Sequence, residues 1–140
     1  SSAGALGLMQ LMPKTAVSLM RERKPKANPT VREIMQPRLN AKLGTRYLGR
    51  MMRAFGNHLE YALAAYNAGP GAVTRWRQRR GYLPAEIFVE EIPYRETRLY
   101  IRKILSWKRK FEFMLAHRDQ LQKVKKRKQS RRVKRLPTPG

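Results

Sequence analysis

The stretch Ala62-Leu-Ala-Ala-Tyr-Asn-Ala-Gly-Pro-Gly71 decides how this chain folds. Its first seven residues are mostly alanines, whose small side chains let other helices approach closely, and this predicts a buried central helix. Gly69-Pro70-Gly71 then ends the helix, because glycine permits positive φ and proline lacks a backbone N–H. Tyr66 and Asn67 fall in its last turn, where a phenol and a carboxamide can face a polar ligand. Taken alone, an ordinary helix C-terminus is the simpler interpretation.

A second unusual stretch, Gly7-Leu-Met-Gln-Leu-Met-Pro13, comes earlier in the chain. Gln10 is embedded among apolar residues, and a buried glutamine needs hydrogen-bond partners for both ends of its amide. Pro13 suits the first turn of a helix. Two such stretches in one short chain favour a ligand site over two unrelated packing features.

The remaining sequence has helical periodicity and predicts an all-α fold. Apolar residues recur every three or four positions, and no segment has the sustained alternation or the turn signals of paired strands. Thr30 and Glu33 have the spacing of a capping box, and Pro37 should end the short helix that follows it. The expected helices span residues 13–23, 31–36, 38–55, 58–68, 72–80, 85–91 and 94–116.

Composition excludes several classes of protein. The chain of 140 residues has no cysteine and therefore no disulfide or thiolate metal site. His58 and His117 are distant in sequence and have no patterned acidic neighbours, so we expect neither a metal nor a cofactor. No run of apolar residues is long enough for a transmembrane helix.

The positive charge is concentrated near the C-terminus. The formal net charge is +23, and residues 117–140 hold ten Lys or Arg residues against one acid, Asp119. We expect a domain over residues 1–116 and a basic tail over residues 117–140 that attracts polyanions such as anionic lipid, acidic envelope polymers or nucleic acid. The tail should be helical to about Lys128 and disordered beyond Ser130.

Four stretches match, in order, those of a known family: Gly4–Ala16, Leu39–Leu48, Ala64–Gly71 with Val73 and Trp76, and Phe88–Tyr94 followed by Glu96-Thr97-Arg98 and Tyr100. From Ser1 to about Leu105 the chain resembles the catalytic domain of the soluble lytic transglycosylase family. The resemblance implies a lysozyme-like helical bundle with a sugar-binding cleft.

The resemblance also implies an activity. The family consists of bacterial carbon–oxygen lyases that cleave peptidoglycan (murein) at the β-1,4 bond between N-acetylmuramic acid and N-acetylglucosamine. The 6-hydroxyl of the muramic acid attacks and leaves a 1,6-anhydro ring. One glutamate then suffices as acid and base, whereas an ordinary glycoside hydrolase needs two carboxylates. The implied location is the periplasm or cell envelope, and the implied partner is the peptidoglycan glycan strand.

The resemblance assigns roles residue by residue. Gln10 and Met12 become wall residues of the cleft, and Ser1 matches a serine near the catalytic group. Tyr66 matches a tyrosine that supports the catalytic carboxylate, and Asn67 lies beside it as an amide contact to the sugar. Glu90 matches an acidic residue on the far side of the cleft.

One departure from the family concerns the catalytic glutamate. In the family it belongs to a Glu-Ser motif that precedes the position of Ser1, and no Glu-Ser pair occurs in residues 1–140. Since residue 1 is serine, we expect a processed product or a fragment that lacks the general acid and is inactive by itself.

Two other interpretations fit parts of the sequence. A non-catalytic peptidoglycan-binding remnant would explain the absent Glu-Ser motif. A nucleic-acid-binding protein would explain the charge, although the tail has no interleaved aromatic residues for base stacking.

Overall fold

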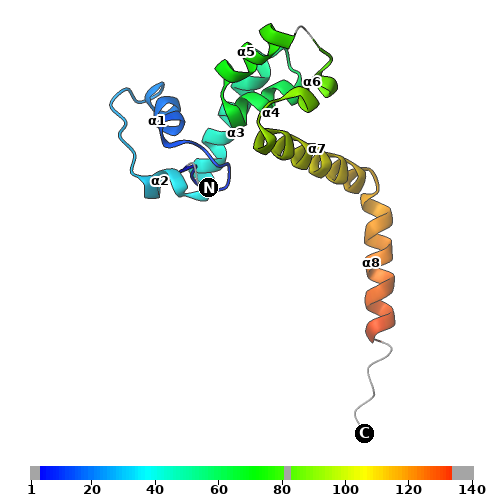
Figure 1. Ribbon diagram of the computed structural model, residues 1–140. Coiled ribbons are helices and arrows are strands. Elements are labelled where there is room, and N and C mark those ends of the chain that lie inside the picture. The colour runs from blue at the N-terminus through cyan, green and yellow to red at the C-terminus, as the bar shows by residue number, and fades with distance from the viewer. Residues whose placement is uncertain (1–3, 81–82, 134–140) are drawn as a thin grey trace. The chain divides into compact units, whose positions relative to one another are not determined.

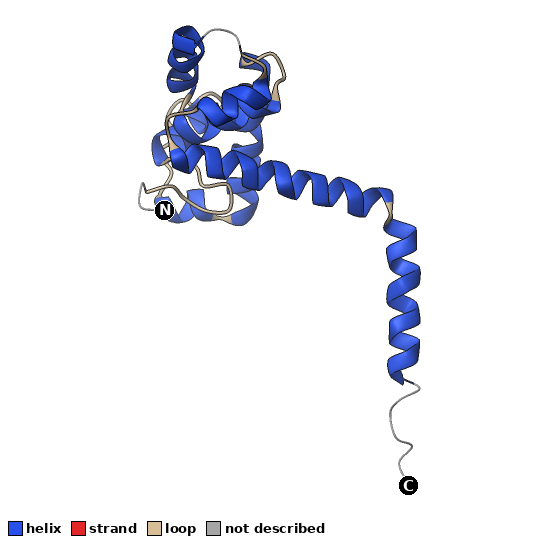
Figure 2. Ribbon diagram, turned by 45° about the vertical axis from the view of Figure 1, so that its right-hand side comes forward, coloured by secondary structure: helices blue, strands red, loops and turns tan. Residues whose placement is uncertain are grey.

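The computed structural model describes residues 4–80 and 83–133. These residues form eight α-helices and no strand, which confirms the all-α prediction (Figures 1 and 2). The helices are α1 (Pro13–Arg21), α2 (Val31–Met35), α3 (Pro37–Ala54), α4 (Leu59–Ala68), α5 (Pro70–Arg80), α6 (Ala85–Glu91), α7 (Arg95–Ala116) and α8 (Arg118–Val133).

The compact unit formed by residues 1–101 is organised around α3 and α4. Helices α1 and α2 pack against α3 on one side, and α4 packs against α3, α5 and α6 on the other (Figure 1). The path of α3 therefore links an N-terminal half, which carries the loop before α1, to a second half built on α4.

Helix α4 is the buried helix that its alanines predict. Ala62, Ala64 and Ala65 have no exposed surface. The helix ends at Gly69, which has a φ of 89°. Glycine adopts this conformation without the steric strain that a side chain would cause. The next helix, α5, begins at Pro70 rather than at Ala72, because the fixed φ of proline suits a first helical turn.

The other helix starts follow their local signals. Thr30 accepts a hydrogen bond from the backbone N–H of Glu33, and the Glu33 carboxylate accepts one from the Thr30 backbone, so the capping box is formed. Pro37 both follows the end of α2 and opens α3, so the two helices are separated by Gln36 alone.

Two apolar clusters hold the unit together. In the N-terminal half, buried side chains come from the loop before α1 and from the first three helices: Leu11, Ala16, Leu19, Ile34 and Leu43. Around α4, the Tyr61 ring meets Phe88 edge-on at 4.8 Å between centroids, and Trp76 and Ile92 are buried. These closely packed side chains hold in place the backbone that carries the polar residues described below.

Residues 102–140 form a second unit, which contains the end of α7 and all of α8. The division at Ile101 lies inside α7, earlier than the boundary expected at residues 116 and 117. Helix α8 also continues past Lys128 and Ser130 to Val133, because Gln, Lys and Arg are good helix formers. The expected disorder after Val133 falls on residues 134–140, which lie outside the described part of the chain.

Candidate functional site

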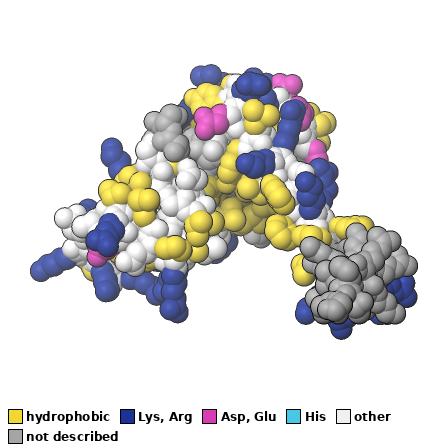
Figure 3. Space-filling model, turned by 90° about the horizontal axis from the view of Figure 1, so that it is seen from below, with side chains coloured by type: hydrophobic (Ala, Val, Ile, Leu, Met, Phe, Trp, Pro, Cys, Tyr) yellow, Lys and Arg dark blue, Asp and Glu magenta, His cyan; other side chains and the backbone are white. Residues whose placement is uncertain are grey.

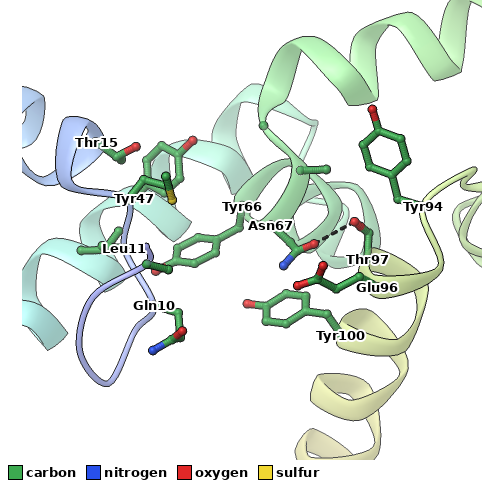
Figure 4. Close-up of a pocket in the computed structure, with 14 residues that line it drawn as sticks. Gln10, Leu11, Thr15, Tyr47, Tyr66, Asn67, Tyr94, Glu96, Thr97 and Tyr100 are labelled. Carbon is green, nitrogen blue, oxygen red and sulfur yellow. Dashed lines mark hydrogen bonds between the residues drawn. The ribbon is translucent and has the colours of Figure 1, made fainter. Parts of the chain in front are cut away.

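A cavity of about 750 Å³ opens within the unit of residues 1–101 (Figure 4). Its walls come from the loop before α1, from α3, from the end of α4 and from the start of α7. The lining residues are Ala5, Gln10, Leu11, Met12, Thr15, Tyr47, Tyr66, Asn67, Ala68, Gly69, Tyr94, Glu96, Thr97 and Tyr100.

The loop before α1 folds back on itself and presents Gln10. Leu6 and Leu11 pair in an isolated antiparallel bridge, with N···O distances of 2.8 and 3.0 Å. Gln10 has a φ of 49°, an uncommon conformation for a residue with a side chain, and such strain is often found at functional sites. The Gln10 amide nitrogen donates to the Gly7 carbonyl at 2.8 Å, so the amide oxygen is the end that can accept from a ligand.

Leu11 fixes which way its neighbours face. Its side chain is 1% exposed and belongs to the N-terminal core, whereas Gln10 and Met12 on either side are exposed. The buried leucine therefore presents both neighbours to the cavity.

Asn40 attaches this loop to the helices. Its side chain is fully buried on α3 and accepts from the Met9 backbone N–H at 2.7 Å. The same amide donates to the carbonyls of Leu6 and Ile34, each at 3.0 Å. One side chain thus satisfies three main-chain groups from two segments, which holds the loop in a single position.

Two glycines make this close approach possible. A Cβ added at Gly7 would lie 2.5 Å from the Asn40 amide nitrogen, and one added at Gly44 would lie 2.4 Å from Met9 Cβ. Gly7 also has a φ of 69°. The loop can therefore lie directly against α3 only because these two positions lack side chains.

Tyr66 braces the loop from the other side of the cavity. Its hydroxyl donates to the Met9 carbonyl at 2.8 Å, and its ring lies 5.2 Å from that of Tyr47. Burial raises the pKa of the Tyr66 phenol far above its ordinary value, with smaller contributions from Tyr100 and Tyr47. The phenol therefore stays protonated at neutral pH and remains a hydrogen-bond donor.

Asn67 has its amide orientation set by Thr97. The Thr97 hydroxyl, in a residue that is 2% exposed, donates to the Asn67 side-chain oxygen at 2.7 Å. Since the oxygen is engaged, the Asn67 amide nitrogen is turned toward the opening, as Figure 4 shows. The cavity thus presents a fixed N–H donor at this point.

The start of α7 supplies a wall that the site assignment from sequence did not include. Tyr94, Glu96, Thr97 and Tyr100 line the cavity, and the Tyr94 ring meets Trp76 edge-on at 5.1 Å. Burial raises the pKa of the Tyr100 phenol. The available signal was the spacing: Tyr94, Thr97 and Tyr100 recur every three residues, which places them on one face of a helix.

The structure brings together four of the six residues assigned from sequence. Gln10, Met12, Tyr66 and Asn67 line one cavity, and Ser1 lies outside the described residues. Glu90 is not among the residues that line this cavity, and its assignment to the sugar cleft stays a prediction. Helix α6 buries Phe88 and Val89, which leaves Glu90 on its exposed side, and Glu96 contributes the carboxylate of the described lining instead.

Around these elements the surface is basic. On the face seen in Figure 3, Lys and Arg side chains are widely spread and Asp and Glu are few. A polar cavity with one carboxylate, on a cationic domain, suits a ligand that carries hydroxyl and amide groups and belongs to an anionic polymer.

The helical architecture and the cavity between its two halves define a domain with the lysozyme-like fold. The chain belongs to the family described as "Transglycosylase SLT domain", whose profile matches residues 1–89. It is 35% identical over 122 residues to the soluble lytic murein transglycosylase of Escherichia coli K12. That match covers 86% of this chain but 19% of the relative, so the chain spans about a fifth of the relative's length.

Solved structures of lytic transglycosylases have a similar fold. The crystal structure of the 70-kDa soluble lytic transglycosylase from Escherichia coli superposes with a TM-score of 0.74 at 36% identity, covering 82% of this chain and 19% of that one. A complex of the 70-kDa soluble lytic transglycosylase with bulgecin A gives the same TM-score at 35% identity and the same coverage of both chains. Fold and family expected from the four stretches are thus confirmed.

Proposed function

We propose that this chain forms the glycan-binding part of a murein lytic transglycosylase of the cell envelope. The whole enzyme cleaves the β-1,4 bond between N-acetylmuramic acid and N-acetylglucosamine and forms 1,6-anhydro-N-acetylmuramic acid. The observation that carries the proposal is the cavity that joins Gln10, Tyr66, Asn67 and Glu96 in a member of this family.

The chemistry of the cavity supports a sugar ligand. Aromatic faces from Tyr66, Tyr94 and Tyr100 can cover the apolar faces of sugar rings, while amides and a carboxylate exchange hydrogen bonds with hydroxyl and acetamido groups. The Asn67 N–H donor and the Glu96 carboxylate both line the cavity and offer a donor and an acceptor. Secondary amides and sugar hydroxyls need both.

The role of this chain in the reaction is to hold the strand. Because the nucleophile in this chemistry is a substrate hydroxyl, placing the sugar ring supplies much of the acceleration. Tyr66 donates its one hydroxyl proton to the Met9 carbonyl, so its part is to position the loop that carries Gln10 and Met12. The Glu-Ser motif of the family does not occur in residues 1–140, so we assign binding and positioning, rather than proton transfer, to these residues.

Binding of a defined tetrasaccharide of alternating N-acetylglucosamine and N-acetylmuramic acid tests the proposal. Calorimetry on the 140-residue chain should give weaker binding by about tenfold for Glu96→Gln and for Asn67→Ala, since each loses a ligand hydrogen bond. Glu90→Gln is the matched control, because it removes the same charge outside the cavity. Equal losses for Glu96→Gln and Glu90→Gln, or no binding by the parent chain, would overturn the assignment.

A product assay separates binding from catalysis. Incubation of residues 1–140 with isolated peptidoglycan should release no 1,6-anhydromuropeptides above a blank. Anhydro product formed by these residues alone would mean that a carboxylate among them, with Glu96 the first candidate, acts as the acid.

A further inference from the structure

The end of α7 carries an apolar stripe that nothing above has used. Trp107, Phe111, Met114 and Leu115 are separated by four, three and one residues, and at 100° per residue this places them on one face of the helix. Their exposed fractions are 48%, 55%, 42% and 70%. The same periodicity that buries Ile101 at the start of α7 continues here on side chains that lie open.

The exposure of these four side chains to water is unfavourable. Four large side chains on one stripe make a contiguous patch, and such patches on folded domains mark interaction surfaces. The four residues together are called here the Trp107 stripe. The ring centroids of Trp107 and Phe111 lie 6.1 Å apart, so the aromatic part of the stripe is continuous.

Basic residues border the Trp107 stripe on both edges. Lys108 and Lys110 lie one and three residues after Trp107, and helical geometry turns them to opposite sides of it. The Lys110 ammonium lies 4.8 Å from the centroid of the Trp107 ring. Residues 102–140 as a whole hold fifteen Lys or Arg residues against two acids, Glu112 and Asp119.

We propose that the Trp107 stripe binds the surface of a lipid bilayer with anionic headgroups, with the helix lying in the plane of the interface. An apolar face with tryptophan and phenylalanine, bordered by lysines whose stems can reach the headgroups, is the pattern of interfacial helices. Among the described helices, none is long and apolar enough to cross a membrane.

Other occupants fit the charge or the apolar face, but not both. A second copy of this chain would bring its own excess of positive charge to the same face, which opposes close pairing. Glycan strands and nucleic acids can neutralise the lysines, yet they offer no hydrocarbon in which Phe111 and Leu115 could be buried. An anionic bilayer supplies both.

Vesicle binding by the 140-residue chain tests this surface. Sedimentation with vesicles of phosphatidylglycerol and phosphatidylcholine should show binding that is absent with phosphatidylcholine alone. The double variant Phe111→Ser/Leu115→Ser should bind at least about tenfold more weakly, because it removes most of the buried apolar area. Vesicles carrying brominated acyl chains should quench Trp107 emission, and Trp107→Phe should remove that quenching.

The control removes two large aliphatic side chains away from the stripe. Ile87→Ser/Leu99→Ser changes residues of similar exposure, 52% and 48%, neither of which adjoins Trp107. It should change binding by less than about twofold, and circular dichroism should match the parent for both doubles because all four side chains are exposed.

Three results would overturn the proposal. Equal binding by the two double variants would mean that charge alone holds the chain to lipid. Absence of binding to anionic vesicles would exclude a bilayer as the partner. A dimer in analytical ultracentrifugation that Phe111→Ser/Leu115→Ser abolishes, without vesicle binding by the parent, would assign the face to self-association. None of these outcomes bears on the sugar cavity, whose test uses different residues.

Discussion

Asn40 makes three hydrogen bonds from a fully buried side chain, and each of them reaches main chain that positions the cavity. Asn40→Ala leaves these groups unpaired, so we expect it to lower the free energy of unfolding by about 2–4 kcal/mol. It should also speed amide exchange of the loop over residues 6–11. Urea denaturation and hydrogen exchange measure both effects.

The control for Asn40 is Gln78→Ala, which shortens an exposed amide on α5. It should change stability by less than about 0.5 kcal/mol. A loss at Asn40 no larger than this would show that the loop is held by Leu11 and Tyr66 without the amide.

Tyr66 makes stability depend on pH in the alkaline range. Burial raises the pKa of its phenol above that of the unfolded chain, which is about 10. The folded state therefore keeps a proton that the unfolded state loses. Its contribution to stability is fully present below about pH 10 and is lost as the pH rises from there toward the folded pKa.

Tyr66→Phe should therefore flatten the fall in unfolding free energy above pH 10 by up to one proton, or about 1.4 kcal/mol per pH unit. At neutral pH it should cost about 1 kcal/mol, for the lost bond to Met9. Denaturation at several pH values measures both quantities, with Tyr94→Phe, an exposed tyrosine, as the comparison. Identical slopes for parent and Tyr66→Phe would contradict the buried-donor assignment.

Substitution by alanine should have opposite effects on stability at two glycines of α3. A Cβ at Gly44 would meet Met9 at 2.4 Å, whereas one at Gly49 would have its nearest neighbour, an Arg53 nitrogen, at 3.6 Å. Gly44→Ala should therefore destabilise by about 1–3 kcal/mol and weaken tetrasaccharide binding, because it pushes the loop away. Gly49→Ala should be neutral or stabilise by up to about 1 kcal/mol, since alanine favours helix.

Thermal unfolding of the two variants checks this pair. The same residue change on the same helix removes any general effect of alanine for glycine. If Gly44→Ala is as stable as Gly49→Ala, the loop can shift by a few tenths of an ångström without cost, and its position is less constrained than its contacts indicate.

The helices α6 and α7 show what sequence periodicity alone leaves open. Glu90 and Glu96 are six residues apart, and both lie in the stretch that carries the family resemblance. Which of them faces the cavity depends on the break at Ile92 and Pro93, where the chain leaves α6 and enters α7 in a new direction. Helical periodicity cannot be carried across such a break.

For the whole molecule, the C-terminal charge should affect affinity for anionic polymers more than it affects folding. Removing residues 123–140 deletes nine of the chain's basic residues and only three aliphatic ones, Val124, Val133 and Leu136. We expect weaker sedimentation with isolated peptidoglycan at low salt, while the circular dichroism from residues 1–116 stays nearly unchanged. Raising the ionic strength should reduce the difference, since screening acts within roughly 8 Å at physiological salt.

Equal sedimentation of the full and shortened chains at low salt would contradict this expectation. So would binding that does not respond to salt in either chain. In that case the positive charge of residues 123–140 has no part in holding the domain near its substrate.

The sequence by itself determined the helical class, the buried alanine helix that ends at Gly69, the capping box at Thr30 and the family. These depend on local chemistry and on periodicity within one helix, both of which can be read from neighbouring residues. It also predicted that Gln10, Met12, Tyr66 and Asn67 share one site.

Only the tertiary structure decided which partners complete that site. Thr97 orients Asn67 across 30 residues, Asn40 holds Met9 across 31, and Glu96 supplies the carboxylate of the cavity wall. Tertiary structure likewise left the Trp107 stripe exposed on a helix whose periodicity favours burial. Such pairings depend on how rigid helices pack against one another, and no pattern along a single segment contains that information.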